Sequence, residues 1–320
     1  MIYDVIIIGA GPAGLTAAIY AIRRVMKTLI IAKDIGGQAN LAGRVENYPA
    51  IFNIAGYELM QKMKEQADKL GVKFNLDEVV GIEKDGDLFI VKTIGGKEIS
   101  KTVIIASGLI PRDLGVPGEE KFKGKGVSYC ATCDAPFYKN KIAAVVGGGN
   151  SAVDAALLLS KFAKKVYLVH RRQGFRADEM LVCQLRETKN IELVLDSVIS
   201  EIKGNEMVKS IIVSNVNSGD KREIKVDGVF VEIGYTTKID WFKDMVKLNE
   251  RNEIITDKEC KTSTPGIFAA GDITDISFKQ IVISAGEGAK AALSAYRYLH
   301  PMDKGNSEAR AFDWGKCKRT

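Results

Sequence analysis

Apolar runs rich in β-branched residues recur along the chain, and two of them lead into a glycine-rich turn followed by a helix-like stretch. Continuous apolar runs of this length are typical of parallel strands that are buried on both faces. The runs that fit this description are 3–8, 28–32, 102–106, 141–146 and 166–169. Strands that alternate with helix-like segments predict an α/β fold built from βαβ units.

The first glycine-rich turn follows the apolar run at the N-terminus. Residues 9–14 read Gly-Ala-Gly-Pro-Ala-Gly, and residues 15–20 are helix-like. In a strand–turn–helix context the first glycine forms the tight turn, the second lets the backbone approach a pyrophosphate, and the third allows close helix packing. The helix N-terminus then points its positive end at the phosphates. This context favours a dinucleotide site over a turn without a ligand.

A second turn of the same kind begins at Gly147. Residues 147–152 read Gly-Gly-Gly-Asn-Ser-Ala, between the apolar run 141–146 and a helix predicted over 152–162. The strand 166–169 completes this second βαβ nucleotide-binding unit. Two such units in one chain amount to an internal repeat of function.

The residues that end the second strand of each unit indicate which nucleotide binds. A ribose-binding acid is expected there in an NAD site. The first unit has Ala32-Lys33 at this place, with Asp34 slightly late, so it is not a plain NAD site. The second unit has His170-Arg171-Arg172 and then Arg176, and guanidinium groups suit a 2′-phosphate. We therefore predict NADPH over NADH; the alternative is an exposed basic turn.

The remaining patterns suggest that one unit is inserted into the other. A helix is predicted near 57–70, a β-rich insertion over 71–105, and further β-rich sequence over 191–235. Prolines at 111 and 117, and Gly234-Tyr235, mark the two places where the chain would cross between domains. The prediction is two Rossmann-like three-layer domains, with residues 112–240 inserted between 1–111 and 241–320.

The motif Cys130-Ala131-Thr132-Cys133-Asp134 lies just before the second unit. Five cysteines in a long chain without secretory features argue against a structural disulfide framework, so the close pair is redox-active or metal-binding. A zinc site would need two further ligands, and Cys183, Cys260 and Cys317 are isolated. The pair is therefore predicted to be redox-active, with the other three as incidental thiols.

An apolar strand near the C-terminus runs into Gly271-Asp272, which could place a carboxylate on a cofactor hydroxyl. The alternative for Asp272 is a turn or N-cap carboxylate. Lys279-Gln280-Ile281 opens a long helix predicted to reach about Leu299, and its N-terminal dipole could stabilise negative charge on a reduced cofactor.

Composition adds few constraints. The chain has 320 residues, which suits two domains; apolar residues are 46%, charged residues are 27% and the net charge is +6. The positive charge is spread without a polybasic block, so nucleic-acid binding is unsupported, and an acidic protein partner is the second interpretation. No apolar run is long enough to span a membrane, and no signal peptide is recognisable. We expect a cytoplasmic protein.

These motifs, in this order, resemble the low-molecular-weight thioredoxin reductases over nearly the whole chain. The matching stretches are 9–14, 36–38, 46–49, 130–134, 147–152, 170–172, 175–177 and 264–272. The resemblance implies a homodimer that binds FAD in the first unit and NADPH in the second. The implied FAD residues are Gly9, Gly11, Pro12, Ala13, Gly14, Gly36, Gly37, Gln38, Asn47, Ala106, Gly271, Asp272, Lys279, Gln280 and Ile281. The implied NADPH residues are Gly147, Gly149, Asn150, Ser151, Ala152, His170, Arg171, Arg172 and Arg176.

The resemblance also implies the reaction. Electrons pass from NADPH through FAD to a Cys130–Cys133 disulfide, and then to the disulfide of thioredoxin. Cys133 would lie against the flavin, and Cys130 would undergo thiol–disulfide exchange with the partner. Asp134 would transfer the proton. Because Cys133 and Gly147 are close in sequence, they share one domain, and the family's domain rotation would present them to the flavin in turn.

Two departures bear on the partner. Lys279 stands where many members have arginine, and residues 286–290 are more similar to the flavoprotein subunit of alkyl hydroperoxide reductase. Thioredoxin is the expected partner and a glutaredoxin-like protein is the alternative. Two other functions compete: a redox sensor without turnover, which would not need all these motifs, and a ferredoxin–NADP reductase, which generally lacks the cysteine pair.

Overall fold

The computed structural model describes residues 1–42 and 45–301. The helices are α1 (Pro12–Arg23), α2 (Gly56–Lys69), α3 (Glu119–Phe122), α4 (Ala131–Asp134), α5 (Asn150–Ser160), α6 (Glu179–Glu187) and α7 (Ile281–Leu299), with 3₁₀ turns η1 (Gly37–Leu41) and η2 (Ala135–Tyr138). The strands before the second glycine-rich turn are β1 (Ile2–Ala10), β2 (Thr28–Ile35), β3 (Lys73–Leu76), β4 (Val79–Asp85), β5 (Leu88–Thr93), β6 (Lys97–Ile105), β7 (Ile110–Pro111), β8 (Val127–Ser128) and β9 (Ile142–Val146). The later strands are β10 (Lys165–Val169), β11 (Ile191–Val194), β12 (Ser197–Gly204), β13 (Val208–Asn215), β14 (Lys221–Lys225), β15 (Gly228–Val231), β16 (Tyr235–Thr236) and β17 (Ile267–Ala269).

The first sheet has the order β3-β2-β1-β6-β5-β4, and β17 also pairs with β6. Strand β6 changes partner along its length: its first half pairs antiparallel with β5, and Val103–Ile105 pair in parallel with β17. The parallel part of this sheet is therefore closed by a strand from the C-terminal region. This agrees with the α/β fold that the apolar runs predict.

The expected β-rich insertion over residues 71–105 is wrong in one respect. Strand β3 pairs in parallel with β2, and β4 to β6 continue the same sheet, so these residues extend the first sheet rather than interrupt it. Local residue pattern identifies strands but not their partners, because pairing is decided by long-range packing.

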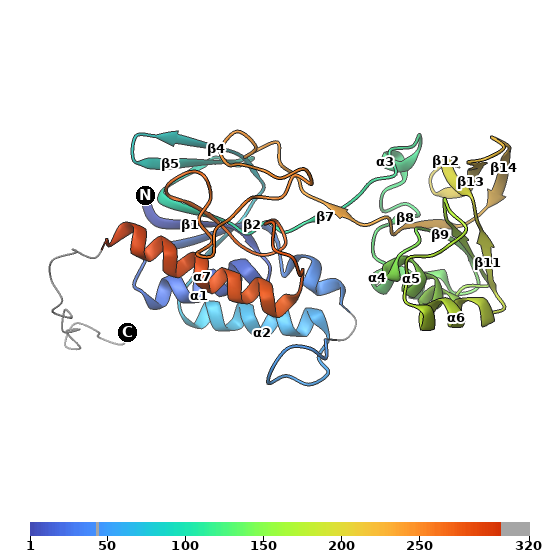
Figure 1. Cartoon of the computed structure of the whole chain (residues 1–320), viewed down its shortest axis with the longest axis horizontal. Helices are drawn as coiled ribbons and strands as arrows, with labels where there is room; N and C mark the ends of the chain where they lie inside the picture. Colours follow the sequence, from blue (N-terminus) through green and yellow to red (C-terminus); the bar gives the residue numbers. More distant parts are fainter. Residues whose placement is uncertain (43–44, 302–320) are drawn as a thin grey trace.

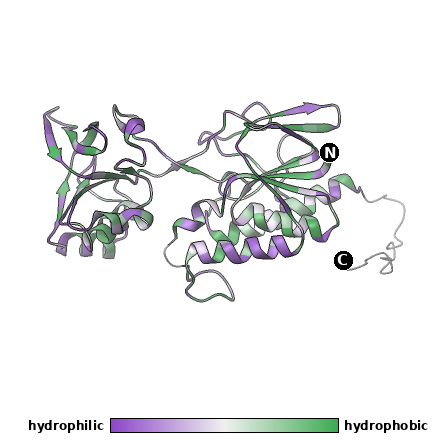
Figure 2. Cartoon of the chain, turned by 180° about the vertical axis from the view of Figure 1, so that it is seen from behind, coloured by the Kyte–Doolittle hydropathy of each residue, from purple (hydrophilic) through white to green (hydrophobic). Residues whose placement is uncertain are grey.

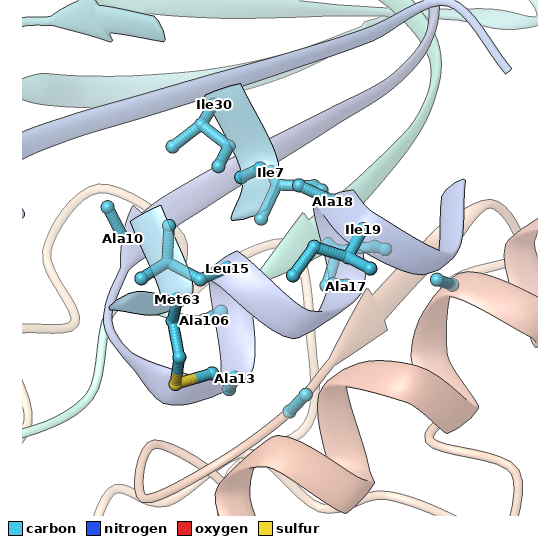
Figure 3. Packing of buried hydrophobic residues seen from close by; sticks show 14 of the residues in the cluster. Ile7, Ala10, Ala13, Leu15, Ala17, Ala18, Ile19, Ile30, Met63 and Ala106 are labelled. Carbon is cyan, nitrogen blue, oxygen red and sulfur yellow. The ribbon is translucent and has the colours of Figure 1, made fainter. Parts of the chain in front are cut away.

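Alternate residues of β1 face opposite sides of the sheet. Val5 and Ile7 belong to the core beneath helices α1, α2 and α7, whereas Ile6 and Ile8 belong to the core on the other face. Figure 3 shows Ile7 of β1 between Ile30 of β2 and Ala18 of α1. Burial on both faces explains why these strands are uninterrupted apolar runs.

The second sheet is parallel, with the order β11-β10-β9-β15-β8. Ala143 and Val145 of β9 pack toward α5, and Ala144 and Val146 pack toward the antiparallel sheet β12-β13-β14. This sheet is thus the middle layer of three. Figure 2 shows apolar residues concentrated along the strands of both parallel sheets, with polar residues on the outer faces of the helices.

Two short strands run between the two sets of layers. Strands β7 and β16 pair antiparallel, with Tyr235 opposite Pro111 and Thr236 opposite Ile110, and Arg112 N donates to Gly234 O at 2.9 Å. Figure 1 shows the two sets of layers on either side of this ribbon. We propose that the domain boundaries lie at this ribbon, one at residue 111 in β7 and the other near residue 240, shortly after β16. Within the described residues, no helix is long and apolar enough to cross a membrane.

The packing of α7 on α1 generates a stability prediction. A Cβ atom on the buried Gly288 would lie 2.0 Å from the carbonyl oxygen of Ala13, so Gly288→Ala must push the two helices apart. We expect this change to lower the free energy of unfolding by about 1–3 kcal/mol in urea titrations. Gly286→Ala is the matched control: it lies in the same helix, is exposed and meets no atom within 4 Å, and should be neutral or slightly stabilising. Equal urea midpoints for the two variants would contradict the packing.

Candidate active site

The first glycine-rich turn is fixed by close backbone contacts. Gly9 has φ +109°, and a Cβ atom there would stand 2.2 Å from the carbonyl oxygen of Ala106. A Cβ atom on Gly14 would stand 1.9 Å from the carbonyl oxygen of Gly9. A Cβ atom on Gly11, by contrast, would have no neighbour closer than Gly36 O at 3.7 Å. The turn is packed tightly behind and open in front, which suits close approach of a phosphate.

A cavity of about 570 Å³ opens in front of this turn. Its volume is in the range of small-molecule and cofactor sites. Most residues predicted for FAD line it: Gly9, Gly11, Pro12, Ala13, Gly36, Gly37, Gln38, Ala106, Gly271, Asp272, Lys279, Gln280 and Ile281. Gly14 lies behind the turn, and Asn47 is connected to the cavity wall through a 3.1 Å hydrogen bond from its Nδ2 to Gln280 Oε1. The residues present therefore fit a bound dinucleotide.

Polar side chains at one end of the cavity were missed by the sequence analysis. Glu78 accepts from Lys33 at 2.7 Å and from Lys238 at 2.8 Å, and all three residues line the cavity. The hydrogen bonds from Lys238 and Lys33 hold the pKa of Glu78 below its usual value. The carboxylate near the end of β2 is thus that of Glu78, which belongs to another segment of the chain. In the sequence, the only indication of this arrangement was that Lys33 stands where an acid is usual.

The wall formed by the C-terminal region is held by side-chain hydrogen bonds. Ser284 Oγ donates to Asp272 Oδ1 at 2.8 Å, which orients this carboxylate at the start of α7. Lys279 Nζ forms a 3.1 Å ion pair with Glu253 and also donates to the carbonyl oxygen of Thr274. Lys279 is therefore anchored to the protein as well as lining the cavity.

The second glycine-rich turn is built in the same way on β9. Gly147 has φ +151°, and a Cβ atom there would stand 2.2 Å from the carbonyl oxygen of Glu232. A Cβ atom on Gly148 would fall on the ring of His170, at 2.0 Å from Cε1. His170 is buried and stacks on Phe175 with ring centroids 5.2 Å apart. Burial lowers the pKa of His170, and the neighbouring arginines act in the same direction, so its neutral ring supports this turn.

The basic segment after β10 folds back over the turn. Arg176 N donates to Gly148 O at 2.8 Å, and Asn150 exchanges hydrogen bonds with Asp178 at 2.8 and 3.1 Å. Arg171, Arg172 and Arg176 are exposed, and none of them forms an ion pair with another described residue. The predicted nucleotide residues on the turn, Gly147, Gly149, Asn150, Ser151 and Ala152, are therefore adjacent to the segment with His170 and the three arginines.

Cys130 and Cys133 form a disulfide, with Cα atoms 5.4 Å apart, at the start of the single-turn helix α4. Cys133 N donates to Cys130 Sγ at 3.1 Å, and Cys130 N donates to Ser128 Oγ at 3.1 Å. Cys133 is exposed and Cys130 is partly buried. Asp134 is the last residue of α4. The pKa of Tyr138 is raised to about 12, first by burial of the tyrosine and then by the charge of Asp134.

A polar cluster behind the disulfide was also missed. Tyr129, the residue before Cys130, has its hydroxyl 2.7 Å from Asp113 and 2.8 Å from Glu119. Glu119 is only 3% exposed and accepts the backbone N–H groups of Leu114 and Gly115 at 2.8 and 2.7 Å. The chain leaving the β7–β16 ribbon is thereby attached to the residue next to the disulfide.

The other cysteines do not join the pair. Cys183 is exposed on α6, and Cys260 is buried with Sγ 3.1 Å from Glu287 Oε2. Cys317 lies outside the described residues. In the part of the chain that the structure describes, no group of three or more His, Cys, Asp or Glu side chains is placed to hold a metal ion.

The structure does not bring all predicted site residues together. The cavity of the first unit is lined neither by the disulfide nor by the turn at Gly147. In Figure 1, α4 and α5 lie together on one side of the β7–β16 ribbon, and α1 and α7 lie on the other. The arrangement therefore contains a cysteine pair and a glycine-rich turn in one set of layers, and a separate cavity that fits a dinucleotide in the other.

Comparison with known proteins identifies the family. The family described as pyridine nucleotide-disulphide oxidoreductase matches residues 3–289. The chain is 41% identical over 306 residues to a thioredoxin reductase of Peptoclostridium acidaminophilum, covering 93% of this chain and 97% of the relative. A thioredoxin reductase structure from Lactococcus lactis, described as the FR conformation, matches with 41% identity and a TM-score of 0.84, covering 93% and 99% of the two chains. One from Streptococcus pyogenes matches with 42% identity but a TM-score of 0.61, covering 93% and 98%. The chain belongs to the pyridine nucleotide-disulphide oxidoreductase family, in the group of low-molecular-weight thioredoxin reductases.

Proposed function

We propose that the chain reduces the disulfide of thioredoxin with electrons from NADPH, through FAD and the Cys130–Cys133 pair. One observation supports this most: a disulfide and a glycine-rich turn with three exposed arginines lie in one set of layers, and the other set contains a cavity that fits a dinucleotide. The family implies a flavin and a nicotinamide nucleotide. The assignment of the cavity to FAD and of the second turn to NADPH is part of the proposal.

The residues of the cavity would hold the cofactor and keep it oriented. The turn from Gly9 to Gly14 would take the pyrophosphate on the N-terminus of α1, and Asp272, fixed by Ser284, would accept from a cofactor hydroxyl. Lys279 and the N-terminus of α7 would place positive charge at the same wall. FAD, when bound there, would supply the chemistry that accepts a hydride and passes on two electrons.

At the thiol pair, two electrons and two protons convert the Cys130–Cys133 disulfide into two thiols. One thiol then loses its proton, and the thiolate attacks the partner's disulfide to form a mixed disulfide. The other cysteine attacks that bond, which restores the Cys130–Cys133 disulfide and releases the partner as a dithiol. Asp134, in the same single-turn helix, is the group proposed to give and take the proton.

Because the disulfide and the turn at Gly147 both lie away from the cavity, we propose that one set of layers rotates about the β7–β16 ribbon. The comparisons support this. Two thioredoxin reductases match with nearly equal identity and coverage, yet their TM-scores are 0.84 and 0.61. When sequence identity is nearly equal, a difference of this size in TM-score is expected if the two sets of layers are arranged differently relative to each other.

The partner and the assembly remain proposals. Thioredoxin is the proposed substrate because a relative of which this chain covers 97% is a thioredoxin reductase. A glutaredoxin-like protein is the alternative outcome of the assay below. A homodimer and a cytoplasmic location follow from the resemblance and are proposed on that ground.

The proposed activity predicts a specific pattern of NADPH consumption. The FAD-loaded protein should oxidise NADPH rapidly with thioredoxin, slowly without it, and poorly when NADH replaces NADPH. Cys133→Ser should abolish turnover, because the disulfide can no longer form, and Cys183→Ser on the exposed face of α6 is the control that should retain it. The measurement is the absorbance loss of the reduced nucleotide. Turnover by Cys133→Ser at the rate of the unchanged protein would refute the proposal.

The exposed arginines predict the nucleotide preference. Arg171→Ala with Arg176→Ala should raise KM for NADPH roughly 10- to 100-fold, since hydrogen bonds between charged groups contribute about 1.5–3 kcal/mol. KM for NADH should change little, because NADH lacks the 2′-phosphate. Arg186→Ala, on the exposed surface of α6, is the matched control. An equal rise for both nucleotides would mean that the arginines do not contact the 2′-phosphate.

The proposed rotation predicts more than one distance between the two sets of layers. Donor and acceptor dyes can be attached at Cys183 on α6 and at Gln66→Cys on α2, both exposed, in a Cys317→Ser background. Single-molecule energy transfer on the FAD-loaded protein should show two populations whose ratio changes when NADPH is added. A control pair within one set of layers, Cys183 with Lys221→Cys, should give one constant distance. A single unchanging distance for the first pair would exclude the rotation.

A further inference from the structure

The end of β2 is the place where a βαβ nucleotide unit holds the ribose of its ligand, usually through an acid on that strand. In this chain Lys33 stands there, so an acceptor for the ribose hydroxyls must come from another residue. Strand β3 supplies a neighbouring segment. Leu76 lies opposite Ala32 in the parallel pairing of β3 with β2, and Asp77 N donates to Ala32 O at 3.0 Å. The connection between β3 and β4 is therefore held against the end of β2.

Three carboxylates line the cavity in this region, namely those of Asp34, Asp77 and Glu78. Asp77 accepts Glu78 N at 2.7 Å on Oδ1 and Gly95 N at 3.0 Å on Oδ2, so both of its oxygens are used by the backbone. Asp34 is exposed and accepts Gly37 N at 3.1 Å within its own turn. The positions of these two side chains are thus explained by the turns that they stabilise.

Glu78 is different, because its partners leave one oxygen available. Lys33 Nζ and Lys238 Nζ both contact Oε1, at 2.7 and 2.8 Å. Among the residues that the structure describes, none donates a hydrogen bond to Oε2. Glu78 is partly buried, and the hydrogen bonds from Lys238 and Lys33 hold its pKa below the usual value, so the group is charged at neutral pH. The result is an oriented carboxylate in the cavity wall with one free acceptor atom.

We propose that Glu78 is the ribose acceptor of the first nucleotide site, with Oε2 accepting a hydrogen bond from a ribose hydroxyl in the adenosine half of the bound dinucleotide. The proposal rests on the assignment of this cavity to FAD made above. Lys33 and Lys238 are positioning residues, which hold the carboxylate through Oε1. A charged acceptor suits a hydroxyl donor, because hydrogen bonds to ionised groups are stronger than those between neutral groups.

The test compares FAD with two analogues, one containing 2′-deoxyadenosine and the other 3′-deoxyadenosine. The full-length chain is freed of flavin, and the Kd of each dinucleotide is measured by titration followed by flavin fluorescence. The unchanged protein should bind at least one analogue roughly 10-fold more weakly than FAD, because a hydrogen bond to a charged acceptor is lost.

Glu78→Gln removes the charge and keeps the size of the side chain. It should raise the Kd for FAD roughly 10-fold and lower the ratio of analogue Kd to FAD Kd to about 3 or less. Glu83→Gln is the matched control, since Glu83 is exposed on β4, paired with Lys92 and outside the cavity, and both values should stay unchanged. An equal rise for FAD and the analogues in Glu78→Gln would indicate a purely structural change and overturn the proposal.

Two further variants separate Glu78 from its neighbours. Lys33→Gln should weaken FAD binding less than Glu78→Gln and keep the ratio, because Oε2 remains charged and Lys238 still holds Oε1. A larger loss in Lys33→Gln, with a lower ratio, would assign the ribose contact to the lysine. Loss of discrimination in Asp34→Asn but not in Glu78→Gln would assign it to Asp34. Either result would refute the role of Glu78.

The measurement on the unchanged protein does not depend on how well Glu78→Gln folds. If both analogues bind as tightly as FAD, no ribose hydroxyl is recognised and the proposal is wrong. None of these measurements uses NADPH or thioredoxin. Failure of the unchanged protein to bind FAD would refute the cofactor assignment together with this inference, whereas tight FAD binding without discrimination would refute the inference alone.

Discussion

The site depends on one constraint: the carboxyl ends of neighbouring parallel strands lie side by side at the same edge of the sheet. In the second sheet, β8 leads into the disulfide, β9 leads into the turn at Gly147, and β15 lies between them. The cysteine pair and the second glycine-rich turn therefore lie at one edge of the same sheet. Any reaction that uses both with a cofactor bound in the first sheet's cavity must bring this edge to that cavity.

Close backbone contacts make both glycine-rich turns possible. Gly9 lies against Ala106, Gly147 lies against Glu232, and a side chain at either position would collide with a carbonyl oxygen. In each case the glycine lets a strand end, a turn and a helix N-terminus converge. The same principle extends to Gly148, whose missing side chain leaves room for the His170 ring.

The sequence predicted the elements that carry local signatures. Both glycine-rich turns, the cysteine pair, the basic segment after β10 and the start of α7 at Ile281 lie in the structural contexts that their motifs require. Most residues predicted for FAD line one cavity. Their roles in binding remain proposals. Their grouping around one cavity shows that the spacing of motifs along the sequence predicts much of the arrangement of these residues.

What the sequence could not predict depends on contacts between distant segments. The pairing of β3 with β2, the approach of Lys33 and Lys238 to Glu78, and the attachment of Tyr129 to Glu119 each join segments whose partners no local pattern specifies.

The most direct test of the account is to count thiols formed by NADPH alone. The oxidised, FAD-loaded protein is mixed anaerobically with one equivalent of NADPH, then denatured in an alkylating reagent and analysed by peptide mass spectrometry. The account predicts new labels on Cys130 and Cys133 together, because two electrons open one disulfide. If NADPH is consumed while both cysteines stay unlabelled, the disulfide is not on the path of the electrons and the central claim is wrong.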